Sequence, residues 1–150
     1  MQIEVQLTNA RLEDLPPARP PRGATGAWVE FRGLIRDTEA GQPIVGLEYE
    51  AYERMARSEM ERLLTELARE YPCQAVQVLH RTGLIPVGEA AIIVRIAAVH
   101  RHEAFALLTR FMDRLKEDVP IWKCRARVAD TCFVSTGIGP TSLVNDSLQT

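Results

Sequence analysis

Two lysines are the residues of this sequence whose type and spacing most suggest chemistry. The chain of 150 residues has sixteen arginines, but its only lysines are Lys116 and Lys123, so arginine is its usual cation. Arginine is never deprotonated in proteins, whereas burial can tune a lysine amine into a nucleophile or a proton carrier. Chance composition is the simpler explanation for one lysine, but a pair seven residues apart favours a function.

A helical pattern predicts how Lys116 is placed. Leu108, Met112 and Lys116 follow one another at four-residue spacing, which puts them along one face of a helix. We therefore expect a packed Lys116 stem and a partly desolvated amine, which favours the neutral form. The alternative is a lysine at the edge of the core whose amine reaches solvent. Lys123 follows the helix stop at Pro120, so a returning strand could bring both amines to one pocket.

The tetrapeptide His100-Arg101-His102-Glu103 is a second candidate site, at the end of a predicted strand and the start of a predicted helix. No Ser, Thr, Asp or Asn occupies the cap position, so the first helical amides have no obvious side-chain partner. Arg101 in the first turn also opposes the helix dipole. A bound phosphate would satisfy the amides and pair with His100 and Arg101. Capping by water or by a loop carbonyl, with Arg101 pointing outward, is equally open.

Three further residues, near a strand end or next to Lys123, can be interpreted from their positions in the sequence. Gly33 lies within a predicted strand, which indicates a bulge or the close approach of another backbone. Arg36, at the end of that strand, is a candidate anion clamp, although arginine is common at strand ends. Cys124 adjoins Lys123 but has no evident base, so we interpret it as a small inert residue and not as a nucleophile.

Composition excludes several classes of function. A net charge of −2 argues against a general nucleic-acid binder, and no apolar run approaches the roughly 20 residues that span a membrane. Three cysteines, an odd number without a secretion signal, predict reduced thiols and a cytoplasmic protein. The sequence has no GxGxxG, P-loop, HExxH or GxSxG motif, and its histidines form no ligand set with the cysteines. We therefore predict neither a cofactor nor a metal.

The candidate residues depend on strands and helices that must position them. Alternating and apolar patterns predict strands over 2–8, 27–35, 44–52, 74–80, 90–99 and 121–128. The strand over 90–99 is apolar almost throughout, so we expect it to be central and covered on both faces. The proline-rich segment 11–23 is expected to be a loop or extended. Residues 134–150 are expected to be a loosely ordered tail, or one ordered only by a partner.

Two amphipathic helices are predicted, over 53–71 and 101–117. The order of strands, helix, strands, helix and strand indicates one α+β domain over 1–150. The apolar residues expected to face inward are Met60, Leu63, Leu64 and Leu67 in the first helix and Phe105, Leu108, Met112 and Leu115 in the second.

Five segments, taken in order, resemble the large, catalytic subunit of molybdopterin synthase, the MoaE family. They read GAWVEFRGLIRD, LEYEAYERMA, HRTGLIPVGE, VHRHEAF and MDRLKEDVPIWK, and together they extend over roughly residues 24–123. The resemblance implies an α/β-hammerhead-type fold, with a mainly antiparallel sheet and two principal helices. The sequence departs from the family pattern directly after Lys123, at Cys124 and Arg125.

The resemblance also implies a sulfurtransferase reaction in molybdenum cofactor biosynthesis. A homodimer of large subunits would bind two small ubiquitin-like sulfur carriers, giving a heterotetramer. The C-terminal Gly-Gly of each carrier ends as a thiocarboxylate, which delivers sulfur to cyclic pyranopterin monophosphate and so builds the dithiolene of molybdopterin.

The family's functional residues fall on the candidates identified above. Its essential lysines fall on Lys116 and Lys123, its substrate-contacting arginine on Arg36, and its His-Arg pair on His100 and Arg101, which the resemblance allows to come across the dimer interface. Lys116 would act as an acid/base or as a transient acyl acceptor, and Lys123 would position substrate and stabilise charge. Two alternatives remain: a non-catalytic module for a ubiquitin-like tail, and a regulator that binds a phosphorylated pterin.

Overall fold

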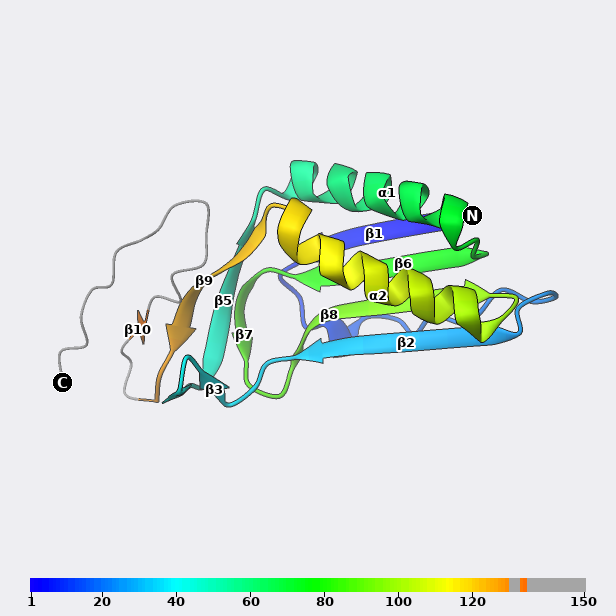
Figure 1. Cartoon of the computed structure of the whole chain (residues 1–150). Helices are drawn as coiled ribbons and strands as arrows, with labels where there is room; N and C mark the ends of the chain where they lie inside the picture. The colour runs from blue at the N-terminus through cyan, green and yellow to red at the C-terminus, as the bar shows by residue number, and fades with distance from the viewer. Residues whose placement is uncertain (130–132, 135–150) are drawn as a thin grey trace.

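Two four-stranded β-sheets and two α-helices are the main elements of the computed structural model, which describes residues 1–129 and 133–134. Figure 1 shows both helices side by side on one face of the first sheet, with the second sheet at one end of it. The predicted α+β class with two principal helices is confirmed. The predicted tail, apart from its first residue, lies outside the described residues.

The first sheet has four strands in the order β1-β6-β8-β2. The β1–β6 pair is parallel and the other two pairs are antiparallel. All nine residues of β8 are buried between the neighbouring strands and the layers above and below, which confirms the predicted central strand. The strands of this sheet are β1 (Gln2–Thr8), β6 (Ala75–Arg81), β8 (Ala90–Ala98) and β2 (Ala27–Leu34).

Helices α1 (Glu53–Glu70) and α2 (Arg101–Asp118) bury one apolar stripe each against the first sheet. The stripe predicted for α1 is confirmed, whereas the one predicted for α2 is wrong in part, because Phe105 is 54% exposed. No helix in the described part of the chain is long and apolar enough to cross a membrane. The buried residues of α2 are Ala104, Leu107, Phe111 and Leu115.

The opposite face of the first sheet is covered by the proline-rich segment. A short 3-10 helix, η1 (Leu12–Asp14), places Leu12 in a small apolar cluster with Leu79 and Ile93. Beside this cluster the guanidinium of Arg95, on β8, donates to Glu30 and Gln77 at 2.7 Å each. The helices cover one face of β8 and the proline-rich segment covers the other, which explains why β8 is buried on both sides.

The second sheet has the order β10-β9-β5-β7 and is antiparallel throughout. A two-stranded hairpin, β3 (Thr38–Glu39) with β4 (Gln42–Pro43), lies between β2 and β5 in the chain. The segment of β7 lies between the strands predicted over 74–80 and 90–99; its glycine and proline are turn residues, and pairing with β5 makes it a strand. The strands of this sheet are β5 (Gly46–Ala51), β7 (Gly83–Pro86), β9 (Ile121–Arg127) and β10 (Phe133–Val134).

Candidate active site

Lys116 lies in the last turn of α2, and its side chain is exposed. The predicted packed stem is therefore wrong. Leu115, the residue before it, closes the buried stripe of α2, and each helical residue is turned about 100° from the one before. Lys116 consequently lies beyond the edge of the core, as the alternative placement had it. An exposed amine at this position is accessible to a second protein chain.

Lys123 lies on β9, and its amine is held by a carboxylate that the sequence did not reveal. Its Nζ donates a hydrogen bond to Glu39 Oε1 at 3.2 Å, which is also an ion pair. The side chains are 29% exposed for Lys123 and 13% exposed for Glu39. A residue 84 positions away in the chain could not be paired with Lys123 by spacing, because only the fold brings the hairpin to β9.

Tyr49 and His80 lie close to this ion pair. Tyr49 is the cross-strand partner of Lys123 on β5, directly after a register shift in the strand pair. Burial, and then the charge of Glu39, raise the pKa of the Tyr49 phenol to about 12. The His80 ring meets the Tyr49 ring edge to face, with centroids 5.7 Å apart. Burial lowers the pKa of His80 to about 4, so both rings are neutral at pH 7.

Arg36 is exposed and follows β2, where the chain leaves the first sheet for the β3–β4 hairpin. The bulge predicted near Gly33 is confirmed, because the register between β2 and β8 shifts after it. A Cβ on Gly33 would lie 2.8 Å from Ile92 Cγ2, so a larger residue would collide there. Figure 1 shows that this end of β2 points toward the second sheet, the sheet that carries Lys123.

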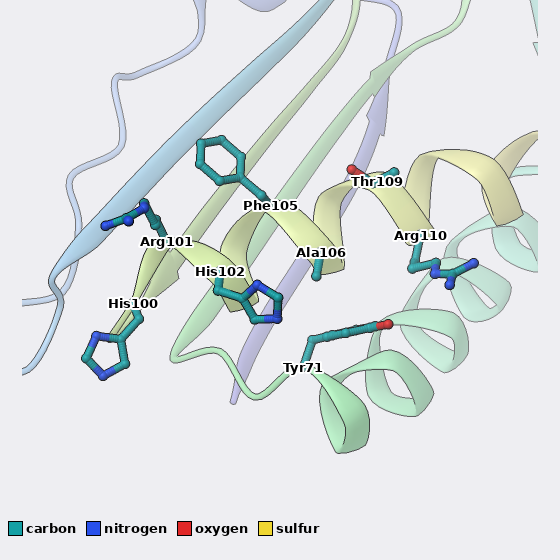
Figure 2. Close-up of a pocket in the computed structure, with 8 residues that line it drawn as sticks. All are labelled: Tyr71, His100, Arg101, His102, Phe105, Ala106, Thr109 and Arg110. Carbon is teal, nitrogen blue, oxygen red and sulfur yellow. The ribbon is translucent and has the colours of Figure 1, made fainter.

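His100 and Arg101 begin α2, at the end of the helix remote from the second sheet. The missing side-chain cap is confirmed, since His100 has extended backbone angles and makes no capping hydrogen bond. A hollow of about 900 Å³ opens here. In Figure 2, His102 lies beside Tyr71, with Arg110 near the other end of the Tyr71 ring, and Phe105 also lines the hollow.

Tyr71 and Arg110 also line this hollow and were not predicted, whereas His102 belongs to the predicted tetrapeptide. Arg110 could have been found by helical spacing from Ala106, whereas Tyr71 could not, because it comes from the end of α1. With Arg101 and two imidazoles, the hollow can accept an anion.

The predicted site residues fall into two groups at opposite ends of α2. Arg101 and Lys116 are fifteen residues apart on one helix, which corresponds to about 22 Å at a rise of 1.5 Å per residue. Arg36, Lys116 and Lys123 belong to the end near the second sheet, whereas His100 and Arg101 belong to the other end. Within a single copy of the chain, the length of α2 therefore separates the two groups.

Cys124 is buried next to Lys123 and has the properties of an inert thiol. Its Sγ donates to the Glu48 carbonyl at 3.3 Å. Burial first, and then the nearby charges of Glu48 and Glu50, raise the pKa of the Cys124 thiol to about 11, so little thiolate exists at neutral pH. The donor atoms of these three residues lie within 4.8 Å of one another, which is a possible ligand set. A protonated thiol already bonded to a carbonyl suits a metal poorly.

Known proteins provide an independent comparison. Residues 4–118 match the sequence profile of the family described as MoaE protein. The molybdopterin synthase catalytic subunit of Homo sapiens is 38% identical over 98 residues, which are 65% of this chain and 52% of that protein. The subunit of the same name from Pyrococcus abyssi (strain GE5 / Orsay) is 41% identical over 100 residues, which are 67% of this chain and 68% of that protein.

The fold is matched as well. The X-ray crystal structure of molybdopterin synthase from Staphylococcus aureus superposes with a TM-score of 0.70 at 27% identity, over 86% of this chain and 91% of that one. The chain spans about half the length of the human relative. Sequence profile and fold agree over most of the described residues, and this chain therefore belongs to the MoaE protein family.

Proposed function

We propose that this chain is a catalytic subunit of molybdopterin synthase. It transfers sulfur from the thiocarboxylated tail of a small ubiquitin-like subunit to cyclic pyranopterin monophosphate, and so forms the dithiolene of molybdopterin. The observation that carries the proposal is the grouping of Lys116, Lys123 and Arg36 at one end of a MoaE-family fold. Family membership supplies the reaction, and the geometry supports a site for it.

The two lysines have different surroundings, which supports different roles. The amine of Lys116 is exposed, so the tail of a partner protein can reach it without rearrangement of the fold. In that position Lys116 acts as an acid/base or as a transient acyl acceptor. In the second case the thiocarboxylate sulfur first bonds to a pterin carbon; the neutral Lys116 nitrogen then bonds to the acyl carbon and loses a proton as the acyl carbon–sulfur bond breaks, the sulfur stays with the pterin, and water later hydrolyses the new amide to release the tail as a carboxylate. Lys123 is fixed by Glu39, which suits a charge that stabilises a developing anion.

The separation of the two cationic groups supports a homodimer. His100 and Arg101 lie about 22 Å from the lysine end of their own chain, so they serve the same substrate only from a second copy. The hollow beside them supplies cations for the phosphate, and the lysine end supplies the groups for sulfur transfer. Two copies related by a two-fold axis would form two equivalent sites.

Reconstitution tests the proposal. The purified chain is mixed with thiocarboxylated small subunit and the pterin precursor, and molybdopterin is measured. We expect turnover by the wild type and a loss of about 10²–10⁴-fold in Lys116→Ala. Lys116→Arg keeps the charge but cannot release the proton, so it should also be impaired. Glu117→Ala, the neighbouring exposed residue, is the matched control and should retain turnover.

Two results would contradict the proposal. Tight binding of the small subunit without any turnover would make the chain a binding module. Full turnover in a folded Lys116→Ala variant, checked by circular dichroism, would remove Lys116 from the mechanism.

A further inference from the structure

We propose that Glu39 is a positioning residue for Lys123, which fixes the amine in place and joins the hairpin after Arg36 to strand β9. This inference rests on the proposed function, because it assigns Glu39 a part in the same site. Its basis is the ion pair between Glu39 and Lys123, with 3.2 Å between Oε1 and Nζ.

The ion pair is sheltered on the Glu39 side. The Glu39 side chain is only 13% exposed, and its charge acts on the buried Tyr49 phenol. His80, which packs against Tyr49, is neutral at pH 7 and brings no charge to this group. A carboxylate with so little contact with water needs a cationic partner, and Lys123 supplies one. Lys123 in turn is left about one-third exposed, enough for its amine to meet a ligand.

The hairpin that carries Glu39 depends on contacts with the rest of the fold. It has two residue pairs, and a hairpin this short has little stability of its own. Its turn residues Ala40 and Gly41 have φ values of 50° and 76°, and the left-handed conformation is unfavourable for alanine. The Ile44 amide donates to the Asp37 carbonyl at 2.9 Å and closes the base of the hairpin. The Glu39–Lys123 pair then holds its strands to β9.

This attachment also relates two residues of the proposed site. Arg36 is three residues before Glu39, so the segment that presents Arg36 is fastened to the strand that presents Lys123. A lysine side chain has many rotamers, and a fixed carboxylate restricts the positions that its amine samples. Charges that stabilise a transition state act best when they are already in place before the reaction.

The test uses the reconstituted complex of the full chain with its thiocarboxylated small subunit. Glu39→Gln removes the charge but keeps the shape, and we expect kcat to fall about 10–100-fold while KM changes less than about threefold. Glu39→Asp, which keeps the charge, should recover part of the loss. Asp37→Asn is the matched control, because it removes an exposed carboxylate from the same segment, and it should behave as the wild type.

A second measurement does not depend on turnover. The chain has two lysines, so labelling with carbon-13 lysine gives two side-chain NMR signals, which Lys116→Arg assigns. In Glu39→Gln we expect the Lys123 signal to shift toward the position of the exposed Lys116 signal, which itself stays unchanged. A wild type that makes no product would refute the proposed function, whereas the lysine spectra would still test the contact.

Three outcomes would overturn the inference. One is a Lys123 signal that does not move in Glu39→Gln. Another is an equal loss of kcat in Asp37→Asn, which would mean that the loss follows from removing any negative charge from this segment and not from breaking the Glu39–Lys123 pair. The third is a lower KM with unchanged kcat in Glu39→Gln, which would mean that Glu39 only competes with the anionic substrate for Lys123.

Discussion

Burial decides the protonation of Tyr49 and His80, the two rings near Lys123. His80 is enclosed, its Nδ1 donates to the Arg81 carbonyl at 2.9 Å, and its pKa is lowered to about 4. Tyr49 stays protonated because burial and Glu39 raise its pKa to about 12. At pH 7, therefore, Lys123 lies near two neutral rings and is paired with the carboxylate of Glu39, and this pair is the contact to test.

The neutral state of His80 predicts a pH dependence of stability. Above pH 6.5, the ordinary pKa of histidine, the folded and unfolded chains both hold a neutral ring. As the pH falls from 6.5 to about 4, only the unfolded chain binds the proton. His80 therefore lowers the free energy of unfolding by about 1.4 kcal/mol for each unit by which the pH falls. Below about pH 4 the folded chain is protonated too, and the contribution levels off.

Urea denaturation between pH 7 and 4.5 measures this effect. The variant His80→Phe should lose the part of the slope that histidine contributes, although its stability at pH 7 changes by the loss of one hydrogen bond. His102→Phe, at an exposed position, is the control and should keep the slope of the wild type. Identical slopes in all three proteins would show that His80 is not kept neutral by burial.

At the scale of the elements, α2 shows what periodicity can and cannot predict. The helix carries two apolar stripes one position apart, one with Leu107 and Phe111 and the other with Phe105 and Met112. Both stripes fit a period of about 3.6 residues, so the helix itself was predicted correctly. Its inner face was assigned to the more apolar stripe, the one with Phe105 and Met112. Lys116 was therefore expected on the buried face in error, whereas α1, with one stripe, was predicted correctly.

Two alanine substitutions test this orientation of α2. Phe111 is fully buried and Phe105 is 54% exposed. Phe111→Ala should lower the free energy of unfolding by about 3–5 kcal/mol, because it leaves a cavity in the core. Phe105→Ala should change it by about 0.5 kcal/mol or less in the monomeric chain. Chemical denaturation measures both, and the reverse order would mean that the inner face of α2 is the predicted one.

Short elements in the second sheet escaped prediction for a different reason. Strand β7 and the β3–β4 hairpin contain glycine and proline and are two to four residues long, so their local sequence favours turns. They become strands only through pairing with each other or with β5. Glu39 lies in such an element, and for that reason its contact with Lys123 could not be predicted from the sequence.

At the scale of the whole molecule, the sequence identified site residues but not their arrangement. Arg36, His100, Arg101, Lys116 and Lys123 were singled out by type, spacing and resemblance, and the structure divides them between two ends of a helix about 22 Å apart. The distance follows from the length of α2 alone. In the proposed function, the site is therefore built from two copies, in which the lysines of one copy face His100 and Arg101 of the other.

A mixed dimer tests this account most directly. Arg101→Ala and Lys116→Ala chains are produced together with different tags, and the dimer containing one of each is purified and assayed for molybdopterin formation. Each parent should be nearly inactive. In the mixed dimer one of the two sites combines an intact lysine end with an intact arginine end, so we predict about half of the wild-type activity. A mixed dimer as inactive as its parents would contradict a site shared between two copies.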